Sequence, residues 1–444
     1  MKNLHSLRDL HIHFVGIGGI SMSGLAKMAL NQGDKVSGSD LTINHEIELL
    51  QNMGVSITVP HSADCISQDI DLIVYTAAIS SSNVELEKGR ALGIQLMERA
   101  EFLGLIANEY KNVISIAGTH GKTTTTSMIA EILTCAGFNP TVHLGGESKA
   151  LGGNTIIGGR DYFVVEACEY KESFRYLKPT LGIITNVELD HVDYYNSYDD
   201  IKQAFERFAG KCNILISRRE DGIEHNNGVV IGEDWVLKHV EFVYHGYNFN
   251  LFYKGRLFGE FRLNMLGIHN VYNAVNAIIC CHMLGVGEDT ISQAISSLEG
   301  VARRYECIHK FPTGCRVIID YAHHPTELAT SMSGLQGVYG RILYIFQPHT
   351  YTRTKALFED FIDVLEPLKN LVIFKTYPAR ENYVEGGDGK DLWKVLKDKT
   401  NCLYYDNIDK LTEFITQNQQ EYDCVLILGA GDLAEKLKRT HLNA

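Results

Sequence analysis

The segment Ile116–Thr126, IAGTHGKTTTT, decides the fold class of this chain, because it joins an apolar strand pattern to a helical pattern. A phosphate-binding P-loop usually reads G-x-x-x-x-G-K-[ST]. Its end is present at residues 121–123, but Ile116 stands where the first glycine is expected and the remaining glycine is Gly118. The loop is therefore one glycine short, which raises the question of what nucleotide it holds.

The chemistry of this segment is that of a nucleotide phosphate site. Backbone N–H groups of residues 118–122 at a helix N-terminus form a nest for an anion. Lys122 is placed to reach the β- and γ-phosphates, and the Thr123 hydroxyl is a ligand of the kind that Mg²⁺ uses. The competing interpretation is a glycine-rich turn that binds nothing, and the strand before and helix after the G-K-T make it unfavourable.

The length and composition limit the classes of protein to which this chain can belong. A chain of 444 residues has room for two to four domains. The net charge of −13 argues against a nucleic acid partner, which requires a basic face. Ten cysteines occur without a C-x-x-C pair, which favours reduced thiols and a cytoplasmic location. Since no apolar run approaches 18 residues, we expect no signal peptide and no membrane contact.

The first segment, residues 1–108, alternates strand and helix patterns and predicts a parallel sheet. Its opening strand runs into Gly16-x-Gly18, and Asp40 follows the next strand at the distance expected of a ribose ligand. The third position of the dinucleotide fingerprint is Ser21 rather than glycine. This pattern predicts a nucleotide diphosphate, and an NAD-dependent dehydrogenase is an alternative that rests on it alone.

The second segment, residues 109–300, contains the P-loop and two later strands that end in Glu166 and near His191. Both side chains are candidate Mg²⁺ ligands, although each could equally cap a helix or join an ion pair. The polar stretch 218–234 predicts hairpins or loops. A helix over 268–284 brings His269, Asn270 and Asn273 to one face, where amides suit an adenine edge, although asparagine near a helix start is more often a cap.

The third segment, residues 301–444, repeats a strand, a polar tip and a helix four times. The tips read DYAHHPTE, QPHTYTRT, YPAREN and GAGDLAE. In open α/β sheets ligands collect at such tips, where an aspartate suits a ribose and an arginine clamps a phosphate or carboxylate. The candidate ligand residues of this segment are Arg304, Asp320, His349, Arg353 and Arg380.

Taken together, the motifs resemble those of the Mur ligase family over almost the whole chain. The family's own short P-loop, G-T-x-G-K-[ST]-[ST], is found as GTHGKTT at residues 118–124, which accounts for the missing glycine. The other matching runs are HFVGIGGISMSGLA, VSGSD, TNVELDHVDYY, HNVYNAVNA, RRYE, DYAHHPTE, FQPHTYTRTK and YPAREN. HFVGIGG, DYAHHPTE and QPHTYTRTK are similar to the alanine-adding members.

The resemblance implies an α/β fold of three domains: an N-terminal Rossmann-like parallel sheet, a central P-loop ATPase-like domain and a C-terminal Rossmann-like domain. It implies ATP and Mg²⁺ as cofactors, UDP-N-acetylmuramic acid and L-alanine as substrates, and a role in peptidoglycan precursor synthesis. The carboxylate would be activated as an acyl phosphate, which the amine of alanine attacks. The oligomeric state stays open between a monomer and a weak dimer.

The family's site residues carry over position by position. Catalytic roles fall on Lys122, Glu166, His191 and Arg304, and metal ligation falls on Thr123, Glu166 and His191. ATP contacts fall on Gly118, Thr119, His120, Gly121, Lys122, Thr123, Thr124, His269, Asn270, Asn273, Arg304 and Asp320. UDP-sugar contacts fall on Gly16, Gly18, Gly19, Ser39, Asp40 and Thr76, and alanine contacts on Tyr321, His349, Arg353 and Arg380.

Two departures keep alternatives open. The family often reads E-A-D-E-S where this chain has Cys168 at the third position, and many members have arginine where Thr350 stands. A ligase that recycles a ready-made tripeptide onto the same nucleotide sugar is the nearest alternative. A non-catalytic nucleotide-binding regulator on the same fold is another, and the intact P-loop argues against it.

Overall fold

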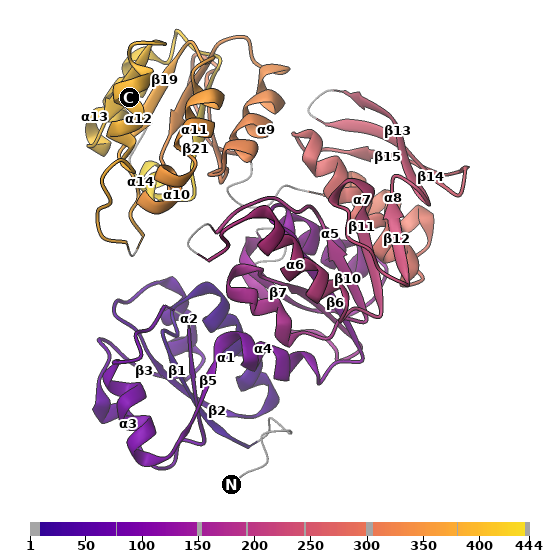
Figure 1. The fold of residues 1–444 in the computed structure, drawn as a ribbon, viewed down its shortest axis with the longest axis vertical. Helices are drawn as coiled ribbons and strands as arrows, with labels where there is room; N and C mark the ends of the chain where they lie inside the picture. Colours follow the sequence, from indigo (N-terminus) through magenta and orange to yellow (C-terminus); the bar gives the residue numbers. More distant parts are fainter. Residues whose placement is uncertain are drawn as a thin grey trace.

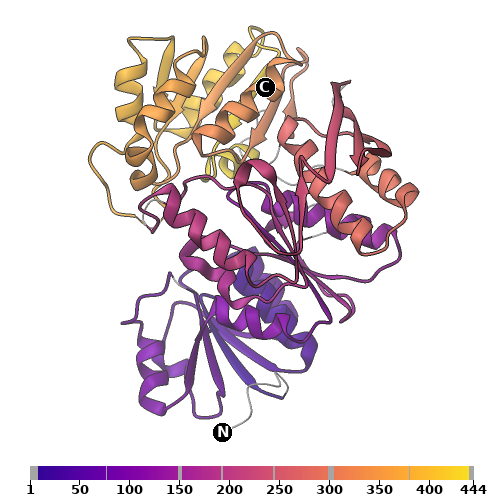
Figure 2. The ribbon, with the colours of Figure 1, turned by 45° about the vertical axis from the view of Figure 1, so that its right-hand side comes forward.

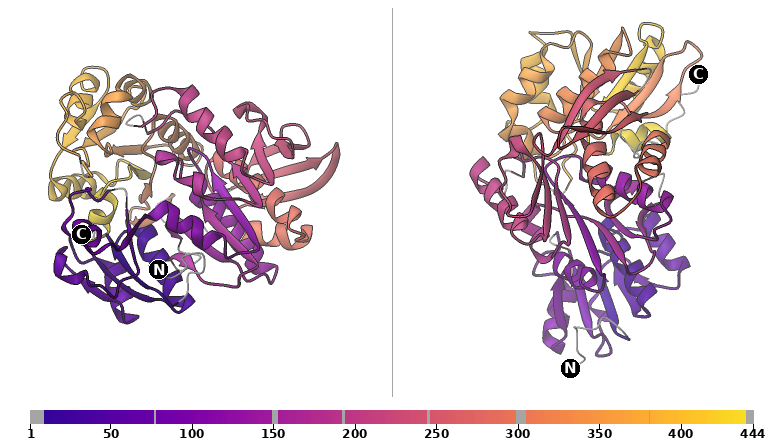
Figure 3. Two further views of the ribbon diagram at one scale, coloured as in Figure 1. Left: turned by 60° about the horizontal axis from the view of Figure 1, so that its bottom comes forward. Right: turned by 90° about the vertical axis from the view of Figure 1, so that its right-hand side faces the viewer.

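Three β-sheets follow one another along the chain, each in its own part of the molecule (Figures 1 and 2). The computed structural model describes residues 9–76, 78–148, 153–191, 194–243, 246–298, 305–379 and 381–439. The N-terminal sheet lies at one end of the long axis, and the C-terminal sheet lies toward the other end, beside the last strands of the central sheet (Figures 1 and 3). The expected α/β architecture with three successive sheets is confirmed.

The N-terminal sheet has five parallel strands among the described residues, in the order β3-β2-β1-β4-β5. This is the order produced when a chain winds outward in both directions from its first strand. The strands are β1 (His11–Val15), β2 (Lys35–Ser39), β3 (Ser56–Thr58), β4 (Leu72–Tyr75) and β5 (Gln95–Glu98). The helices are α1 (Ile20–Gln32), α2 (His45–Asn52), the short η1 (Ala63–Cys65), α3 (Val84–Leu92) and α4 (Arg99–Ala107).

The two faces of this sheet are buried by different helices. Ile12 and Phe14 of β1 belong to the apolar cluster that also contains residues of α1, α2 and α4. Ile73 of β4 belongs instead to a smaller cluster with Leu86 of α3. Because strand side chains alternate between faces, His13 lies on the same face as Ile73, beside α3.

The central sheet is larger and mixed, with the strand order β15-β14-β13-β12-β11-β10-β6-β9-β7-β8. Its strands are β6 (Asn112–Ala117), β7 (Thr141–Ser148), β8 (Gly153–Ile156), β9 (Tyr162–Glu166), β10 (Leu181–Ile184), β11 (Ile214–Arg218), β12 (Gly228–Ile231), β13 (Trp235–Phe242), β14 (Tyr247–Tyr253) and β15 (Arg256–Leu263). Its helices are α5 (Lys122–Cys135), η2 (Tyr170–Tyr176), α6 (Tyr198–Ala209), η3 (Arg219–Asp221), α7 (Ile268–Met283) and α8 (Glu288–Ser297).

The centre of this sheet positions the P-loop. Strands β10, β6 and β9 are adjacent and parallel, so their carboxyl ends meet at one edge. The P-loop follows β6, Glu166 ends β9, and the segment leading to His191 follows β10. The P-loop helix α5 packs on α7 and α8, which buries the apolar residues Met128, Ile129, Ile132 and Leu133 that its pattern predicts.

The C-terminal sheet has the order β16-β17-β21-β18-β19-β20, parallel except for the β16–β17 pair. Its strands are β16 (Glu306–Lys310), β17 (Arg316–Asp320), β18 (Ile342–Phe346), β19 (Leu371–Phe374), β20 (Cys402–Tyr405) and β21 (Cys424–Leu428). Its helices are α9 (Pro325–Gln336), α10 (Tyr351–Ala356), α11 (Phe358–Leu365), α12 (Gly389–Leu396), α13 (Ile408–Asn418) and α14 (Leu433–Arg439). The four predicted polar tips follow β17, β18, β19 and β21.

One local prediction is wrong. The stretch 218–234 is not simply hairpins or loops, because residues 228–231 form β12, a strand that pairs in parallel with β11. The antiparallel hairpins come next, as β13, β14 and β15. The strand itself, GVVI, is largely apolar, but polar residues flank it on both sides and four residues are too few to stand out.

The domains differ in how they contact one another. A single apolar cluster runs from α1 and α4 of the N-terminal domain to Phe163 and Phe205 of the central domain. Contacts between the central and C-terminal domains include the packing of Leu266 against the C-terminal apolar cluster and, in addition, charged side chains described below. No helix in the described part of the chain combines the length and apolar character needed to cross a membrane.

Candidate active site

The P-loop wraps tightly against its neighbours. Gly118 has φ of 134° and Gly121 has φ of 82°, a region that residues with a Cβ rarely adopt. A Cβ on Gly121 would lie 2.4 Å from Asn273 Oδ1 of α7. The loop therefore needs glycine here both for its conformation and for the close approach of α7.

Thr123 and Glu166 meet at the start of α5. The Thr123 hydroxyl donates to Glu166 Oε2 at 2.8 Å, and the backbone N–H of Gly145 donates to the same oxygen at 2.8 Å. A hydroxyl and a carboxylate are oxygen donors of the type that Mg²⁺ prefers when phosphates supply further ligands. The donor set therefore fits a magnesium ion at the end of β9.

Lys122 lies beside a second acid, Glu169. Its ammonium donates to the carbonyl of Thr119 at 2.9 Å and to Glu169 Oε1 at 3.0 Å. Burial alone would lower the pKa of Lys122, but the Glu169 carboxylate outweighs burial and the pKa is raised. The pKa of Glu169 is lowered by Lys122 and His191 in spite of its burial. Both groups are therefore charged at neutral pH.

His191 is held by this same acid rather than by Glu166. His191 Nε2 lies 3.4 Å from Glu169 Oε1, and its ring lies 4.9 Å from that of Tyr170. Thr123 thus pairs with Glu166, and Lys122 is joined to His191 through their shared partner, Glu169. Glu169 links Lys122 to His191, and the sequence analysis gave it no role.

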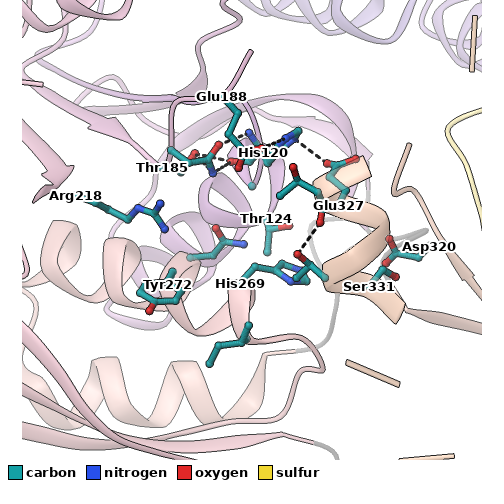
Figure 4. Close-up of a pocket in the computed structure, with 16 residues that line it drawn as sticks. His120, Thr124, Thr185, Glu188, Arg218, His269, Tyr272, Asp320, Glu327 and Ser331 are labelled. Carbon is teal, nitrogen blue, oxygen red and sulfur yellow. Dashed lines mark hydrogen bonds and ion pairs between the residues drawn. The ribbon is translucent and has the colours of Figure 1, made fainter. Parts of the chain in front are cut away.

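A cavity of roughly 220 Å³ opens between the P-loop, α7 and α9 (Figure 4). Figure 4 shows Arg218 and Tyr272 on its central-domain side and Asp320, Glu327 and Ser331 on its C-terminal side. Of the residues predicted to contact ATP, the lining includes His120, Gly121, Thr124, His269, Asn273 and Asp320. The lining residues that no sequence pattern predicted are Thr185, Asn186, Glu188, Arg218, Ile268, Tyr272, Thr326, Glu327, Thr330 and Ser331.

The predicted adenine residues do not share one role in the structure. His269 and Asn273 line the cavity, and Asn270 is buried behind them. The Asn270 side chain donates to the carbonyl of Leu266 at 2.7 Å and accepts from Asn273 Nδ2 at 3.1 Å. Asn270 therefore orients Asn273. On the far side of the cavity the Arg218 guanidinium lies 5.4 Å from the centre of the Tyr272 ring.

His120 of the P-loop connects the central domain to α9. His120 Nδ1 lies 3.1 Å from Glu327 Oε1, and its Nε2 lies 3.6 Å from Glu188 Oε2. Burial would lower the pKa of His120, but the two carboxylates outweigh it and raise the pKa to about 9. The imidazolium is therefore a cationic link between the two domains at neutral pH.

A second ion pair crosses the same interface. Arg353, which was predicted to bind alanine, donates from Nη2 to Asp190 Oδ1 at 3.1 Å and lies 3.2 Å from His349 Nδ1. Burial would raise the pKa of Asp190, but Arg353 outweighs burial and lowers it. The predicted alanine residues Tyr321 and His349 are joined through His323, whose ring lies 5.4 Å and 5.8 Å from theirs.

In the N-terminal domain the predicted UDP-sugar residues other than Ser39 lie at one glycine turn. Asp40 Oδ2 accepts from the backbone N–H of Gly18 at 2.8 Å, so the acid holds the turn itself. Thr76 lies against Gly16, and Gly19 is exposed at the start of α1. The Ser39 hydroxyl is buried and donates to Glu85 Oε2 at 2.6 Å, which directs it away from this turn.

Two predicted site residues, Arg304 and Arg380, lie outside the described residues. Of the residues that the sequence missed, Glu169 follows Glu166 by only three positions, so an acid repeated after a strand end was an available signal. Asp190 and Glu327 carried no such signal, because their partners come from other domains.

Three family profiles match the chain in order. Residues 11–111 match "Mur ligase family, catalytic domain", residues 116–281 match "Mur ligase middle domain", and residues 303–431 match "Mur ligase, glutamate ligase domain". Among curated proteins, the UDP-N-acetylmuramate–L-alanine ligase of Caldanaerobacter subterraneus subsp. tengcongensis is 41% identical and covers 96% of this chain and 95% of its own. The protein of the same name from Lachnospira eligens is 40% identical and covers 96% of each chain.

Solved structures are also similar to this chain over nearly its whole length. The UDP-N-acetylmuramate-alanine ligase of Thermotoga maritima is 30% identical, with a TM-score of 0.83 over 97% of this chain and 98% of its own. A murein peptide ligase of Psychrobacter arcticus shares the fold, with 22% identity and a TM-score of 0.70 over 98% of this chain and 99% of its own. On this full-length similarity in sequence and structure, the chain belongs to the Mur ligase family.

Proposed function

We propose that this protein is an ATP-dependent ligase that joins L-alanine to the carboxylate of UDP-N-acetylmuramic acid. The observation that carries the proposal is its similarity, over 96% of the chain and at 41% identity, to a UDP-N-acetylmuramate–L-alanine ligase. The reaction would belong to peptidoglycan precursor synthesis. A cytoplasmic location accords with ten free cysteines, since such thiols persist in a reducing compartment.

The chemistry explains why a nucleotide site is needed. A carboxylate and an ammonium do not condense in water, because the carboxylate is a poor electrophile and the protonated amine is not a nucleophile. We propose that the muramoyl carboxylate attacks the γ-phosphorus of ATP and forms an acyl phosphate and ADP. The neutral amine of alanine then attacks the acyl carbon, the carbon–oxygen bond to the phosphate breaks, and inorganic phosphate leaves.

We propose that Lys122 and the P-loop backbone stabilise the transferring phosphoryl group. Lys122 is charged, and its ammonium donates to the carbonyls of Gly118 and Thr119 and to Glu169, so one of these bonds would be exchanged for a phosphate oxygen when ATP binds. We assign ATP to the cavity between α7 and α9, with the base beside His269 and Asn273 and the ribose beside Asp320. Arg304 is proposed as a further phosphate ligand on the residue resemblance alone.

We propose Thr123 and Glu166 as the protein ligands of Mg²⁺, with His191 as a further candidate that Glu169 orients. When bound, the ion would offset the negative charge of the phosphates. Support comes from the 2.8 Å contact between the Thr123 hydroxyl and Glu166, and from the ending of β6 and β9 side by side. His191 contacts Glu169 rather than Glu166, which supports the proposal that Glu169 positions His191.

The N-terminal and C-terminal domains would supply the two substrates that are joined. We propose domain divisions after residues 108 and 300, with the UDP group at the turn of Gly16, Gly18 and Gly19. Alanine would lie at the C-terminal strand ends near Tyr321, His349 and Arg353, with Arg380 as a further candidate. The ion pair of Arg353 with Asp190 supports a site that is complete only when the C-terminal domain lies against the central domain.

The proposal is tested by the choice of amine acceptor. Purified protein is supplied with ATP, Mg²⁺ and UDP-N-acetylmuramic acid, and phosphate release is followed with L-alanine, with the recycled tripeptide, or with neither. We expect release that requires L-alanine, and a product heavier than the nucleotide sugar by one alanine residue. Release with the tripeptide alone would favour the recycling ligase, and ATP binding without release would favour a regulator.

A further inference from the structure

A cluster of three metal-ligating side chains lies in the N-terminal domain, on the sheet face covered by α3 and away from the P-loop. It consists of His13 in β1, Cys65 at the end of η1 and Glu85 in the first turn of α3. His13 and Glu85 are 1% and 0% exposed, and Cys65 is partly exposed. Two of the three side chains are therefore buried, and the third is partly open to solvent.

One donor atom from each of the three residues lies within 4.8 Å of the other two, which is close to the spacing of a tetrahedral metal site. Cys65 Sγ lies 3.9 Å from His13 Nε2 and 3.5 Å from Glu85 Oε1, and His13 Nε2 lies 3.4 Å from Glu85 Oε2. Zinc bonds of about 2.0–2.3 Å at tetrahedral angles separate neighbouring donor atoms by about 3.3–3.6 Å. The two separations from Glu85 fall in this range but involve different carboxylate oxygens. A rotation of the carboxylate, and a shift of a few tenths of an ångström between Cys65 and His13, would bring one atom of each residue into place.

His13 also has the outer partner that a metal-bound histidine normally has. Its other ring nitrogen, Nδ1, lies 2.9 Å from the Ser37 hydroxyl. That hydroxyl lies 3.0 Å from His11 Nε2, and His11 Nδ1 lies 2.9 Å from Asp69 Oδ2. Such a chain fixes the ring orientation and leaves Nε2 directed at the cluster.

The charges of the cluster suit a divalent cation. A neutral imidazole, a thiolate and a carboxylate together carry two negative charges, which one Zn²⁺ ion balances in a buried place. The fourth position is left to a water molecule, because His61 Nδ1, although 3.5 Å from Glu85 Oε1, lies 2.8 Å from the Ser39 hydroxyl. The alternative is a hydrogen-bonded polar network that holds η1 and α3 on the sheet and takes no ion.

We propose that His13, Cys65 and Glu85 form a zinc site in the N-terminal domain, separate from the magnesium-dependent chemistry. The thiolate selects zinc over Mg²⁺, which prefers oxygen donors. Binding displaces the thiol proton of Cys65 to solvent. Since Glu85 also accepts from Ser39, which directly precedes Asp40, the ion would stiffen the strand end that carries the glycine turn.

The experiment uses the full chain freed of metal and titrated with Co²⁺ in the presence of millimolar Mg²⁺. Cobalt bound by a thiolate gives a charge-transfer absorption in the near ultraviolet, and a site of histidine and carboxylate alone does not. We expect the absorption to rise until one equivalent of Co²⁺ per chain has been added, and to disappear when one equivalent of Zn²⁺ is added. The readout separates this cluster from the group His120, Glu188 and His324 in the candidate active site, which contains no thiol.

Two serine variants localise the site. Cys65→Ser should lose the absorption and bind zinc about 100-fold more weakly or worse, since even the loss of an outer partner costs 10–100-fold. Cys135→Ser, which changes an exposed cysteine at the end of α5, should behave as the unaltered chain. An unaltered chain without the absorption, or a Cys65→Ser variant that keeps it, would overturn the proposal.

A measurement on the unaltered chain covers the case in which Cys65→Ser does not fold. X-ray absorption at the zinc edge should show one sulfur neighbour at about 2.3 Å together with nitrogen and oxygen neighbours at about 2.0–2.2 Å. A shell without sulfur would contradict the assignment.

Discussion

At the scale of single residues, the candidate site depends on which acid faces which partner. Glu166 contacts Thr123, and Glu169 contacts Lys122 and His191. The meeting of Glu166 with the P-loop was predictable, because the carboxyl ends of neighbouring parallel strands share an edge. The role of Glu169 was not predictable, since it depends on the turn after β9, where Lys171 and Glu172 adopt positive φ.

Lys122→Ala tests the residue that the mechanism relies on most. We expect turnover to fall by roughly 100-fold or more, which is the usual effect of losing one donor to a developing charge. The measurement is the initial rate of phosphate release at saturating substrates. Lys111→Ala is the control, because Lys111 is exposed before β6 and should leave the rate unchanged.

The loss of Lys122 also leaves Glu169 buried without its ammonium partner, so folding has to be checked by circular dichroism. A Lys122→Ala variant that is folded and retains near-normal turnover would remove Lys122 from the mechanism.

At the scale of elements, long periodic segments were predictable and short ones were not. The helix expected over 268–284 is α7 (Ile268–Met283). Strand β12 was missed because it has only four residues, three half-buried and one buried, and so shows no alternation between buried and exposed positions. The antiparallel strand β16 was missed for the same reason, as only partly buried residues alternate along it.

The two ends of α5 offer a matched test of the P-loop. Gly121 and Gly137 have nearly equal φ, 82° and 80°, but a Cβ at residue 121 would lie 2.4 Å from Asn273 Oδ1, whereas a Cβ at residue 137 meets nothing within 4 Å. Gly137→Ala should cost about 1–2 kcal/mol of stability for its left-handed backbone and leave activity intact.

Gly121→Ala should cost the same strain and in addition displace Asn273 from the cavity, which weakens ATP binding by roughly 10-fold or more, the equivalent of about 1.4 kcal/mol. Chemical unfolding and calorimetric titration with ATP measure the two effects separately. Equal ATP affinity in the two variants would show that the contact with α7 does not shape the nucleotide site.

At the scale of the whole molecule, two charged contacts hold the C-terminal domain against the central one. They are Arg353 with Asp190 and His120 with Glu327. Neither pair was predictable, because each joins residues from different domains and depends on how those domains dock. The sequence did supply the candidates, since His120 and Arg353 both belong to motifs that were expected to bind ligands.

Arg353→Ala should loosen this docking. Both side chains are largely buried, and removing one partner of a buried pair costs about 3–5 kcal/mol, because the other charge is left unpaired. Arg341→Ala is the matched control: it breaks an Arg–Asp pair at the surface of the same domain and should cost at most about 1 kcal/mol.

Thermal unfolding of the two variants and of Arg353→Ala/Asp190→Ala provides the comparison. The double variant should be less destabilised than the sum of its single changes. A strictly additive result would indicate that Asp190 and Arg353 do not interact in solution.

Stability should also depend on pH through His120. Its pKa rises from an ordinary 6.5 to about 9 because Glu327 and Glu188 face it, with His324 also nearby. The folded state therefore binds the His120 proton more tightly than the unfolded state does, and this tighter binding adds to the free energy of unfolding. The added stability is fully present below pH 6.5 and is lost as the pH rises through about 9. The difference in unfolding free energy between the unaltered chain and His120→Gln should shrink over that interval, and a difference that grows with pH would contradict the assignment.

The most direct test of the account is the fate of the carboxylate oxygen. UDP-N-acetylmuramic acid labelled with ¹⁸O in its carboxylate is converted with ATP, Mg²⁺ and L-alanine, and the released phosphate is analysed by mass spectrometry. If the carboxylate attacks the γ-phosphorus and the amine then breaks the carbon–oxygen bond, each phosphate carries one labelled oxygen. Unlabelled phosphate accompanying a correct alanine product would contradict the acyl-phosphate mechanism.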